Sequence, residues 1–421
     1  MRIIHVSDSF TPVMGGIETQ VSRLATQLAN RGHDISVLTT TMRDPRRGLG
    51  LTVGEDNAGL AVDPPQKDVP YRVVRSEWPN PLELPVDPRA PKRFVEFIQE
   101  MNPDVVHVHV GELGPVATAV LLDLKDSDIP TVVTVHSVWS KFPTVPTYRE
   151  LARAAKLRRA PILWLPNSEL TAVPVRKVID PSFVRVQNNT VDPDGWLRDP
   201  IAHEGLVAVT ATRFAPRKRV PQLLAVLREV GKELGLNDKG RKGPGLDGTG
   251  ESPELNAKEN VEEKIEAGAS PLRVIIAGEG PGLEAAQRFI ERHGMTGWVE
   301  LPGRLSQEEL MDLYARSDLH ISPSVKDAFS ISGLEARAAG LAILARSQSG
   351  FGAAMQDGTE GRTVLTDKQL GEVLVEWTRS PEVVEDFKRH NRSVPMPYTW
   401  DNAIPQFEGH YRDAADLRRR G

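Results

Sequence analysis

The chain of 421 residues contains no cysteine. Disulfide bonds, cysteine-ligated zinc sites and thiol nucleophiles are therefore excluded. It also lacks any run of about 18 apolar residues, the length that a membrane-spanning helix needs. Residues 1–8 are typical of a short strand and lack the apolar core and cleavage site of a secretory signal. We therefore expect a cytoplasmic location.

An excess of positive charge is also missing. The chain carries 52 lysines and arginines against 57 aspartates and glutamates, a net charge of −5. This charge gives no overall attraction to nucleic acid, and we predict no nucleic-acid partner. The length exceeds the size at which a single hydrophobic core stops growing, so we expect two domains.

Short apolar segments alternate with helical patterns in both halves of the chain. The segments are residues 2–6, 105–110, 131–135, 162–165, 206–210, 273–277, 299–301 and 341–345, and a helix is expected at 220–234. This alternation predicts an α/β fold with two doubly wound domains, each a mainly parallel sheet with helices on both faces. We place the domains at residues 1–192 and 205–397, followed by a helix at 398–421.

Three segments depart from this alternation. Residues 42–91 are rich in Pro, Gly and Asp, and we interpret them as a surface excursion with one strand at 71–74. Residues 237–271 have few large apolar side chains and predict a flexible insertion, because they cannot bury enough surface to offset the entropy lost on ordering. Residues 192–204 have the composition of a linker.

The most informative stretch runs from Pro323 to Arg337. A Pro/Ser turn separates the apolar residues 319–321 from a predicted helix that begins at Ile331. The first N–H groups of a helix lack intrahelical partners and attract anions. Asp327 precedes the helix and Glu335 lies one turn into it, so two acids flank this site. We interpret the turn as the site that holds the phosphates and sugar of an activated sugar donor.

Glycines and histidines follow the predicted strands of the first domain, at the sheet edge where ligands bind in open α/β folds. Gly15 and Gly16 either let the backbone approach a ligand or make a tight turn. His109 and His136 each end a strand, either as ligand contacts or as packed residues. His107 and His109 face the same side of one strand, but no carboxylate lies at a suitable spacing, so we predict no metal site.

Two cations and a glycine pattern follow the predicted strands of the second domain. Arg213 and Lys218 suit a diphosphate, which Arg binds as a fork and Lys as a point charge. The alternative is a solvated basic turn. Gly278 opens a Gly-Glu-Gly-Pro-Gly pattern that lacks the spacing of a dinucleotide fingerprint and indicates close approach of the backbone to a ligand.

Taken in order, these residues resemble the GT-B glycosyltransferases of family 4 (glycosyl transferases group 1), which are retaining enzymes with nucleotide-sugar donors. The resemblance covers nearly the whole chain outside residues 42–91 and 237–271. The matching segments are residues 8–18, 104–109, 134–136, 186–192, 213–218, 278–281, 322–340 and 399–400. It implies two Rossmann-like domains facing across a cleft, with the acceptor on the first, the nucleotide sugar on the second, and a C-terminal helix that crosses back to the first.

The resemblance also implies roles for individual residues. Glu335 would bind the ribose, Asp327 the transferred sugar, and His109 would lie beside the reacting sugar. Arg213 and Lys218 would stabilise the leaving diphosphate, so no metal or other cofactor is needed. The remaining donor contacts would come from Gly15, Gly16, Gly278, Phe329, Ser330 and Ile331. The acceptor hydroxyl would attack from the face that the diphosphate leaves.

Some positions depart from the family pattern. Asp327 stands where a glutamate is usual and Ser330 where a glycine is usual; the hinge reads Asn188-Asn189-Thr190, and Ala342 replaces a proline. Two alternatives to an active glycosyltransferase therefore stay open: a catalytically weak paralogue that binds a nucleotide or glycan, and a GT-B isomerase of nucleotide sugars. The base, the sugar, the hydroxyl acceptor and the oligomeric state have no signal in the sequence.

A basic segment at residues 148–159 has five cations among Leu and Ala residues. One interpretation is a basic amphipathic helix that contacts the inner face of an anionic membrane and reaches a lipid-linked acceptor. The other is an ordinary solvated helix face.

Overall fold

The computed structural model describes residues 1–13, 15–43, 60–66, 69–78, 87–112, 114–141, 143–237 and 270–420. The chain falls into two compact units, one of Met1–Thr190 with Tyr398–Gly421 and one of Val191–Pro397. Nearly all of the predicted insertion at 237–271, and much of the predicted excursion at 42–91, lie outside the described residues.

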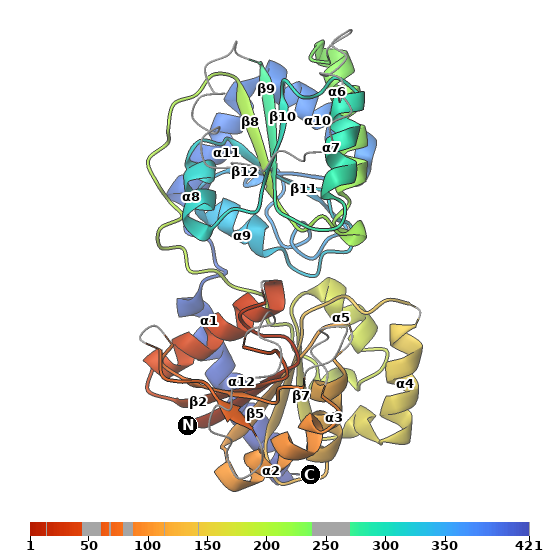
Figure 1. The fold of residues 1–421 in the computed structure, drawn as a ribbon, viewed down its shortest axis with the longest axis vertical. Helices are drawn as coiled ribbons and strands as arrows, with labels where there is room; N and C mark the ends of the chain where they lie inside the picture. Colours follow the sequence, from red (N-terminus) through yellow and green to blue (C-terminus); the bar gives the residue numbers. More distant parts are fainter. Residues whose placement is uncertain are drawn as a thin grey trace, which may run out of the picture. The chain divides into compact units, whose positions relative to one another are not determined.

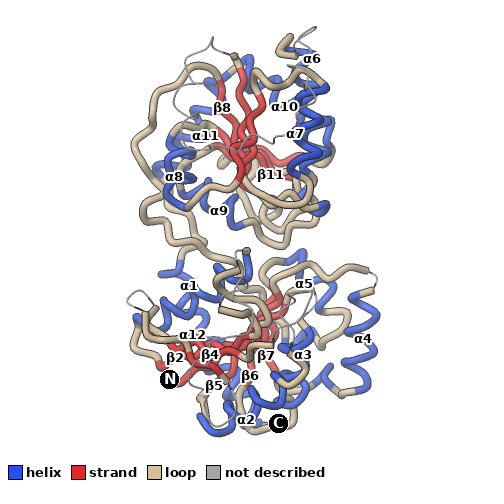
Figure 2. The backbone as a smooth tube through the Cα atoms, in the orientation of Figure 1, coloured by secondary structure: helices blue, strands red, loops and turns tan. Residues whose placement is uncertain are grey.

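The first unit is built on a seven-stranded sheet with the order β3-β4-β2-β1-β5-β6-β7 (Figures 1 and 2). Every neighbouring pair is parallel except β3 with β4. Strands such as β5 are buried along their whole length, because helices cover both faces of the sheet. The strands are β1 Arg2–Ser7, β2 Asp34–Thr39, β3 Ala61–Val62, β4 Arg72–Arg75, β5 Val105–Val110, β6 Thr131–Val135 and β7 Ile162–Pro166.

The helices of the first unit include one from the far end of the chain. They are α1 Gly16–Asn30, α2 Ala90–Met101, α3 Pro115–Leu124, α4 Thr144–Ala154, α5 Glu169–Val175 and α12 Trp400–Arg420, with short 3-10 turns at Leu157–Arg159 and Pro181–Phe183. Helix α12 buries Trp400, Ile404, Phe407 and Tyr411 in one core with Ile3 and other residues of the sheet. Their helical spacing explains why this face packs inward, and the predicted return of the C-terminal helix to the first domain is confirmed.

The second unit repeats the architecture on a six-stranded parallel sheet with the order β10-β9-β8-β11-β12-β13. Its strands are β8 Leu206–Ala211, β9 Leu272–Ala277, β10 Val299–Gly303, β11 Leu319–Ser322, β12 Ala342–Arg346 and β13 Gly361–Val364. Its helices are α6 Val220–Leu234, α7 Leu283–Arg292, α8 Gln307–Ala315, α9 Ile331–Ala338, α10 Asp367–Arg379 and α11 Pro381–Ser393, with a 3-10 turn η3 at Pro216–Lys218. The predicted α/β fold with two doubly wound sheets is confirmed.

The segment before β8 is attached to the second unit along its length. The Ile201 N–H donates to the Ala315 carbonyl at 2.9 Å, and Arg198 forms ion pairs with Glu308 and Asp312 at 2.7 and 2.5 Å. Residues 192–204, which have the composition of a linker, are therefore held by α8 in this structure. No helix in the described part of the chain has both the length and the apolarity that crossing a membrane requires.

Candidate functional site

The strand order of the second unit reverses beside β8. Strands β9 and β10 lie on one side of β8, and β11, β12 and β13 lie on the other. Ligands of open α/β sheets bind outside the carboxyl ends of the strands at such a switch point. Arg213 and Lys218 follow β8, whereas Asp327 and Glu335 follow β11. The predicted cations and Asp327 thus come from the two loops that border this point, and Glu335 comes from helix α9, which follows the second loop.

Lys218 and Asp327 are in direct contact across this switch point. The Lys218 Nζ donates to Asp327 Oδ2 at 2.7 Å, and the two side chains are 24% and 12% exposed. The Ser324 hydroxyl also donates to the Lys218 carbonyl at 3.3 Å. A charge pair this sheltered from water is screened less than a surface pair. A diphosphate that bound here would compete with Asp327 for the ammonium group.

The helix that follows Asp327 begins with its own cap. Ser330 is the N-cap of α9, and its hydroxyl accepts the Gly333 N–H at 3.2 Å. Its backbone has φ −64° and ψ 117°, an ordinary conformation for any residue. Serine therefore stands at this family glycine position without backbone strain.

Glycines hold the neighbouring loops close together. Gly278 has φ +139°, and a Cβ atom there would lie 1.8 Å from the Thr212 carbonyl oxygen, so only glycine fits. The Phe214 N–H donates to the Glu279 carbonyl at 2.8 Å, and the Gly278 N–H donates to the Gly303 carbonyl at 2.7 Å. These bonds join the loops after β8 and β9 to each other and to the end of β10, and they fix the backbone directly after Arg213.

The other charged residues near this switch point are Arg213, Glu335 and Arg219. Arg213 is exposed, and Glu335 is half-buried on α9. Burial and the nearby Glu335 charge raise the pKa of Tyr314 well above its usual value. Arg219, in contrast, pairs with Asp367 at 2.6 Å. The neighbouring cations of this turn therefore have different partners. Lys218 pairs with Asp327, and Arg219 pairs with Asp367 at the start of α10.

The first unit has a switch point of its own, between β1 and β5. Gly15 is the N-cap of α1 and Gly16 is its first residue, and among the described residues no side chain caps this helix. Gly15 is extended, with φ −178°, but a Cβ atom there would lie 2.5 Å from Glu18 Oε2. The Glu18 carboxylate is held there by the Ser9 hydroxyl, which donates to its Oε1. Glycine at this position leaves room for that carboxylate beside the helix start.

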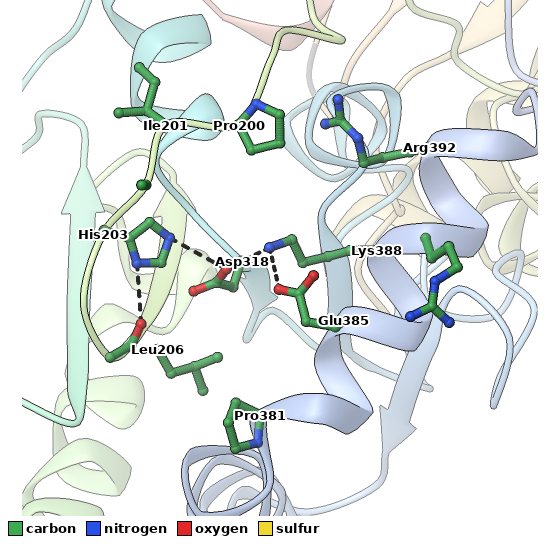
Figure 3. Close-up of a pocket in the computed structure, with 12 residues that line it drawn as sticks. Pro200, Ile201, His203, Leu206, Asp318, Pro381, Glu385, Lys388 and Arg392 are labelled. Atoms are coloured by element: carbon green, nitrogen blue, oxygen red, sulfur yellow. Dashed lines mark hydrogen bonds and ion pairs between the residues drawn. The ribbon is translucent and has the colours of Figure 1, made fainter.

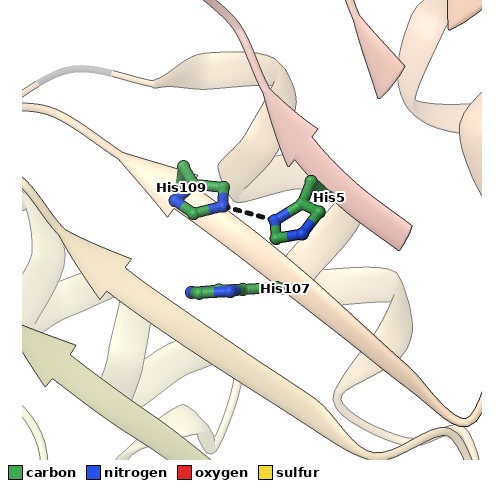
Figure 4. A group of neighbouring side chains, drawn as sticks. All are labelled: His5, His107 and His109. Carbon is green, nitrogen blue, oxygen red and sulfur yellow. Dashed lines mark hydrogen bonds between the residues drawn. The ribbon is translucent and has the colours of Figure 1, made fainter. Parts of the chain in front are cut away.

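On the other side of this switch point, three imidazoles form a hydrogen-bonded chain. His5 Nδ1 lies 2.9 Å from His109 Nε2 (Figure 4). His109 Nδ1 lies 3.0 Å from His136 Nε2. His109 is 3% exposed. Both of its ring nitrogens are thus occupied by other histidines.

Burial keeps these rings neutral. It lowers the pKa of His5 to about 3 and that of His136 to about 4. Burial, together with the neighbouring imidazoles, also lowers the pKa of His107 and of His109 well below the usual value. The structure therefore presents His109 as a neutral, fixed polar ring rather than as an acid.

His5, His107 and His109 also have the composition of a metal site, since one nitrogen from each lies within 4.8 Å of the others. His107, however, uses Nδ1 on the Tyr411 hydroxyl at 3.0 Å and Nε2 on the Thr134 hydroxyl at 2.7 Å. The partners that the described residues give these three rings are neutral, so a cation among them would lack a compensating charge. The cluster is better explained as a polar network that anchors α12.

Two residues of the first unit were missed from the sequence. His5 joins the chain because the β1–β5 register places it opposite His107, and register is not visible in one sequence. Asp8, which follows β1, is 9% exposed and accepts the Ala117 N–H at 2.9 Å at the start of α3. Burial raises the pKa of Asp8 to about 7. The sequence signal for Asp8 was its position as an acidic residue directly after the first predicted strand.

Two doubly wound sheets, with a last helix returned to the first unit, form the GT-B fold. Comparison with known proteins agrees. The model of glycosyltransferase family 4 matches residues 14–194, and the model of glycosyl transferases group 1 matches residues 253–394. The chain belongs to this family and is therefore a glycosyltransferase, in a family that uses nucleotide-sugar donors.

Individual relatives are distant but align along the whole chain. The alpha-monoglucosyldiacylglycerol synthase of Acholeplasma laidlawii is 23% identical, and the alignment covers 99% of this chain and 98% of the relative. The GDP-mannose-dependent alpha-mannosyltransferase of Corynebacterium glutamicum is 24% identical, with 100% and 91% covered. The crystal structure of Anabaena HepE in complex with UDP has a TM-score of 0.69 at 15% identity, with 97% and 99% covered.

Proposed function

We propose that this enzyme transfers a hexose, with retention of configuration and without a metal, from a nucleoside-diphosphate sugar to a hydroxyl acceptor. The observation that carries the proposal is the contact between Lys218 and Asp327 beside the start of α9. In the proposed site, Lys218 serves as the cation for the diphosphate and Asp327 as the acid for sugar hydroxyls, and both lie at the switch point of the second unit. The first unit supplies the acceptor side, with Gly15, Gly16 and His109 at its own switch point.

In this reaction the bond between the anomeric carbon and the donor phosphate oxygen breaks. A bond from the acceptor oxygen to that carbon forms on the same face, and the acceptor proton moves to the departing phosphate. Arg213, Lys218 and the N–H groups at the start of α9, from Phe329 to Ile331, stabilise the charge that develops on the diphosphate. No side-chain base is required, which agrees with a neutral His109 whose nitrogens are both occupied.

The donor must also displace an existing contact. Lys218 is already paired with Asp327, so the diphosphate takes over the ammonium group and releases the carboxylate. The released Asp327 then accepts hydrogen bonds from hydroxyls of the transferred sugar. Glu335, eight positions later on α9, holds the ribose. Transfer of Lys218 from Asp327 to the diphosphate thus frees Asp327 to bind the transferred sugar.

Binding of a matching donor is expected to raise the melting temperature. A ligand present at about 100 times its Kd stabilises the folded state by about 2.7 kcal/mol, which corresponds to roughly 5–10 °C for a unit of this size. UDP-glucose and GDP-mannose, sugars of the kind that relatives and structural neighbours are named for, are the first donors to screen, with UDP and GDP as controls. Release of the nucleoside diphosphate in the presence of acceptors then measures transfer.

The same screen separates the two alternatives. A donor that stabilises the protein but releases no nucleoside diphosphate with any acceptor would indicate a nucleotide-binding paralogue. Conversion of the donor to a different nucleotide sugar without an acceptor would indicate an isomerase. Either result contradicts the proposed transfer.

We further propose that the acceptor is membrane-linked and that α4 and the following turn attract the enzyme to an anionic surface at the inner face of the membrane. Their five cations, Arg149, Arg153, Lys156, Arg158 and Arg159, are all exposed. Val145, Tyr148 and Ala152, on the apolar face of α4, are buried in the core of the first unit. The attraction is therefore electrostatic, without insertion of an apolar helix face.

Replacing Arg149, Arg153 and Lys156 by glutamine is expected to weaken binding to anionic vesicles by about 100-fold, since each cation near the surface contributes about 1 kcal/mol. Co-sedimentation with phosphatidylserine vesicles at low salt measures this. The matched control replaces Arg288, Lys368 and Arg379, whose side chains are 63%, 86% and 59% exposed in the second unit. Equal loss in both variants, or equal binding to neutral vesicles, would contradict the assignment to α4.

A further inference from the structure

The second unit contains a cavity of about 540 Å³. Figure 3 shows the residues that line it. Its lining includes Leu206, the first residue of β8, and Asp318, the residue before β11. The donor loops follow the other ends of these strands, roughly 20 Å away along β8. The cavity has a volume typical of small-molecule sites, and it is separate from the switch point.

One wall of the cavity is a single face of α11. Pro381, Glu385, Lys388, Arg389 and Arg392 line it, and their spacing of four, three, one and three positions follows the helical repeat. The facing wall is the segment 200–205, which leads from the boundary between the units into β8. Ile201 in this segment is 42% exposed although it is apolar. The cavity thus has a charged helical wall and a partly apolar wall.

The floor of the cavity is a satisfied charge network. Asp318 accepts the Lys388 Nζ at 2.7 Å and the Val207 N–H at 2.8 Å, and His203 Nε2 lies at 3.4 Å (Figure 3). Burial alone would raise the pKa of Asp318, but these hydrogen bonds outweigh it and hold the pKa below its usual value. The Lys388 ammonium also reaches Glu385 at 2.6 Å. One ammonium group is therefore shared by the two carboxylates of the floor, Asp318 and Glu385.

Arg392 is different, because its charge is not balanced. Its guanidinium donates to the Arg198 carbonyl at 2.9 Å, and among the described residues no carboxylate lies within 4.0 Å of it. Its aliphatic stem crosses Gly340, where a Cβ atom would lie 2.3 Å from Arg392 Cγ. Glycine at position 340 leaves room for the aliphatic part of the Arg392 side chain. The Arg392 guanidinium lies at the cavity and has further N–H donors besides the one that binds the Arg198 carbonyl.

We propose that this cavity binds a small organic phosphate, with the Arg392 guanidinium on the phosphate and Pro200 and Ile201 against the rest of the molecule. Arginine recognises phosphate through paired, charge-assisted hydrogen bonds. The ligand fills the space between segment 200–205 and α11 and adds contacts to a segment that α8 already holds through Arg198 and Ile201. The cavity is therefore a second ligand site in the second unit, distinct from the donor site in both position and ligand.

The proposal is tested by calorimetric titration of the full chain with glucose 6-phosphate and with inorganic phosphate. Saturable binding of glucose 6-phosphate is expected, together with slower hydrogen exchange at residues 198–206. The Arg392→Gln variant is expected to raise the Kd at least about 10-fold, or about 1.4 kcal/mol. Arg379→Gln makes the same charge change at an arginine that is 59% exposed on α10, and it is expected to leave binding unchanged.

Two further variants locate the binding and guard against misfolding. Lys218→Ala, which removes a donor-site cation, is expected to bind glucose 6-phosphate as the parent does. Ile201→Glu adds a negative charge at an exposed position and is expected to weaken binding without disturbing the fold. No saturable binding below about 10 mM, a Kd unchanged in both Arg392→Gln and Ile201→Glu, or binding lost in Lys218→Ala would each overturn the proposal. Tighter binding of glucose 6-phosphate than of inorganic phosphate supports a contribution from the apolar wall.

Discussion

Replacing Lys218 by alanine is expected to reduce sugar transfer by about 100- to 1000-fold, the loss typical of removing one preorganised stabiliser of transition-state charge. The same change leaves Asp327 without its partner at 2.7 Å. Glu335→Ala is expected to reduce transfer by about 10- to 100-fold, because the proposed site loses its hydrogen bond from the ribose to a charged group. Release of nucleoside diphosphate under saturating donor and acceptor measures both effects.

The matched control for Lys218 is in the same 3-10 turn. Arg217 is exposed, and Arg217→Ala removes the same charge from the same loop. It is expected to retain full activity. Circular dichroism and thermal melting show that each variant is folded. Full turnover in both Lys218→Ala and Glu335→Ala would refute the assignment of the donor site.

The first unit is expected to lose stability steeply as the pH falls below about 6.5. Burial lowers the pKa of His5 to about 3 and of His136 to about 4, and it lowers the pKa of His107 and His109 well below the usual value. In the unfolded chain these groups take up protons near pH 6.5, whereas the folded unit excludes them. Folding is therefore disfavoured as the pH falls toward the depressed folded pKa values.

Asp8 changes the pH dependence of stability in the opposite direction. Burial raises its pKa to about 7, so the folded state binds a proton that the unfolded state does not bind until about pH 4. This offsets one of these four histidines, whereas burial also lowers the pKa of a fifth, His410 on α12, which adds to the same dependence. The remaining three protons correspond to about 4 kcal/mol of unfolding free energy per pH unit. A typical total of about 5–15 kcal/mol is then consumed within a few pH units.

Urea unfolding between about pH 7 and about pH 5 measures this dependence, and hydrogen exchange assigns it to the first unit. The His136→Gln variant removes one of the four groups and is expected to reduce the slope by about 1.4 kcal/mol per pH unit. An unfolding free energy that stays constant over this range would show that the buried histidines are not held neutral.

The periodicity of the sequence was sufficient to predict the repeated elements. The strand at Val105–Val110 and the helix at Val220–Leu234 were predicted with the bounds that the structure has. Both have apolar patterns that match one secondary structure and are bounded by Pro or Gly. Strand β13 and helices α10 and α11 were not predicted; β13 is a short segment, Gly-Arg-Thr-Val, with one apolar side chain, and α11 is largely polar.

The contacts within the sites depend on distances in sequence that local patterns do not cover. The Lys218–Asp327 pair joins residues 109 positions apart, and His5 and His109 are 104 apart. The sequence predicted which residue types follow each strand. The order of the strands in each sheet brings these residues together in space. The attachment of residues 192–204 to α8, and the cavity beside α11, arise from tertiary packing alone and had no sequence signal.

The position of α12 has a consequence for the order in which the protein can be made. The core of the first unit includes Trp400, Phe407 and Tyr411, and the Tyr411 hydroxyl is a hydrogen-bond partner of the buried His107. These residues leave the ribosome after all of the second unit, which spans Val191–Pro397. During synthesis the first unit therefore lacks α12, which covers part of its sheet, until the whole of the second unit has been made and can fold. The N-terminal half of this enzyme is the last to be finished.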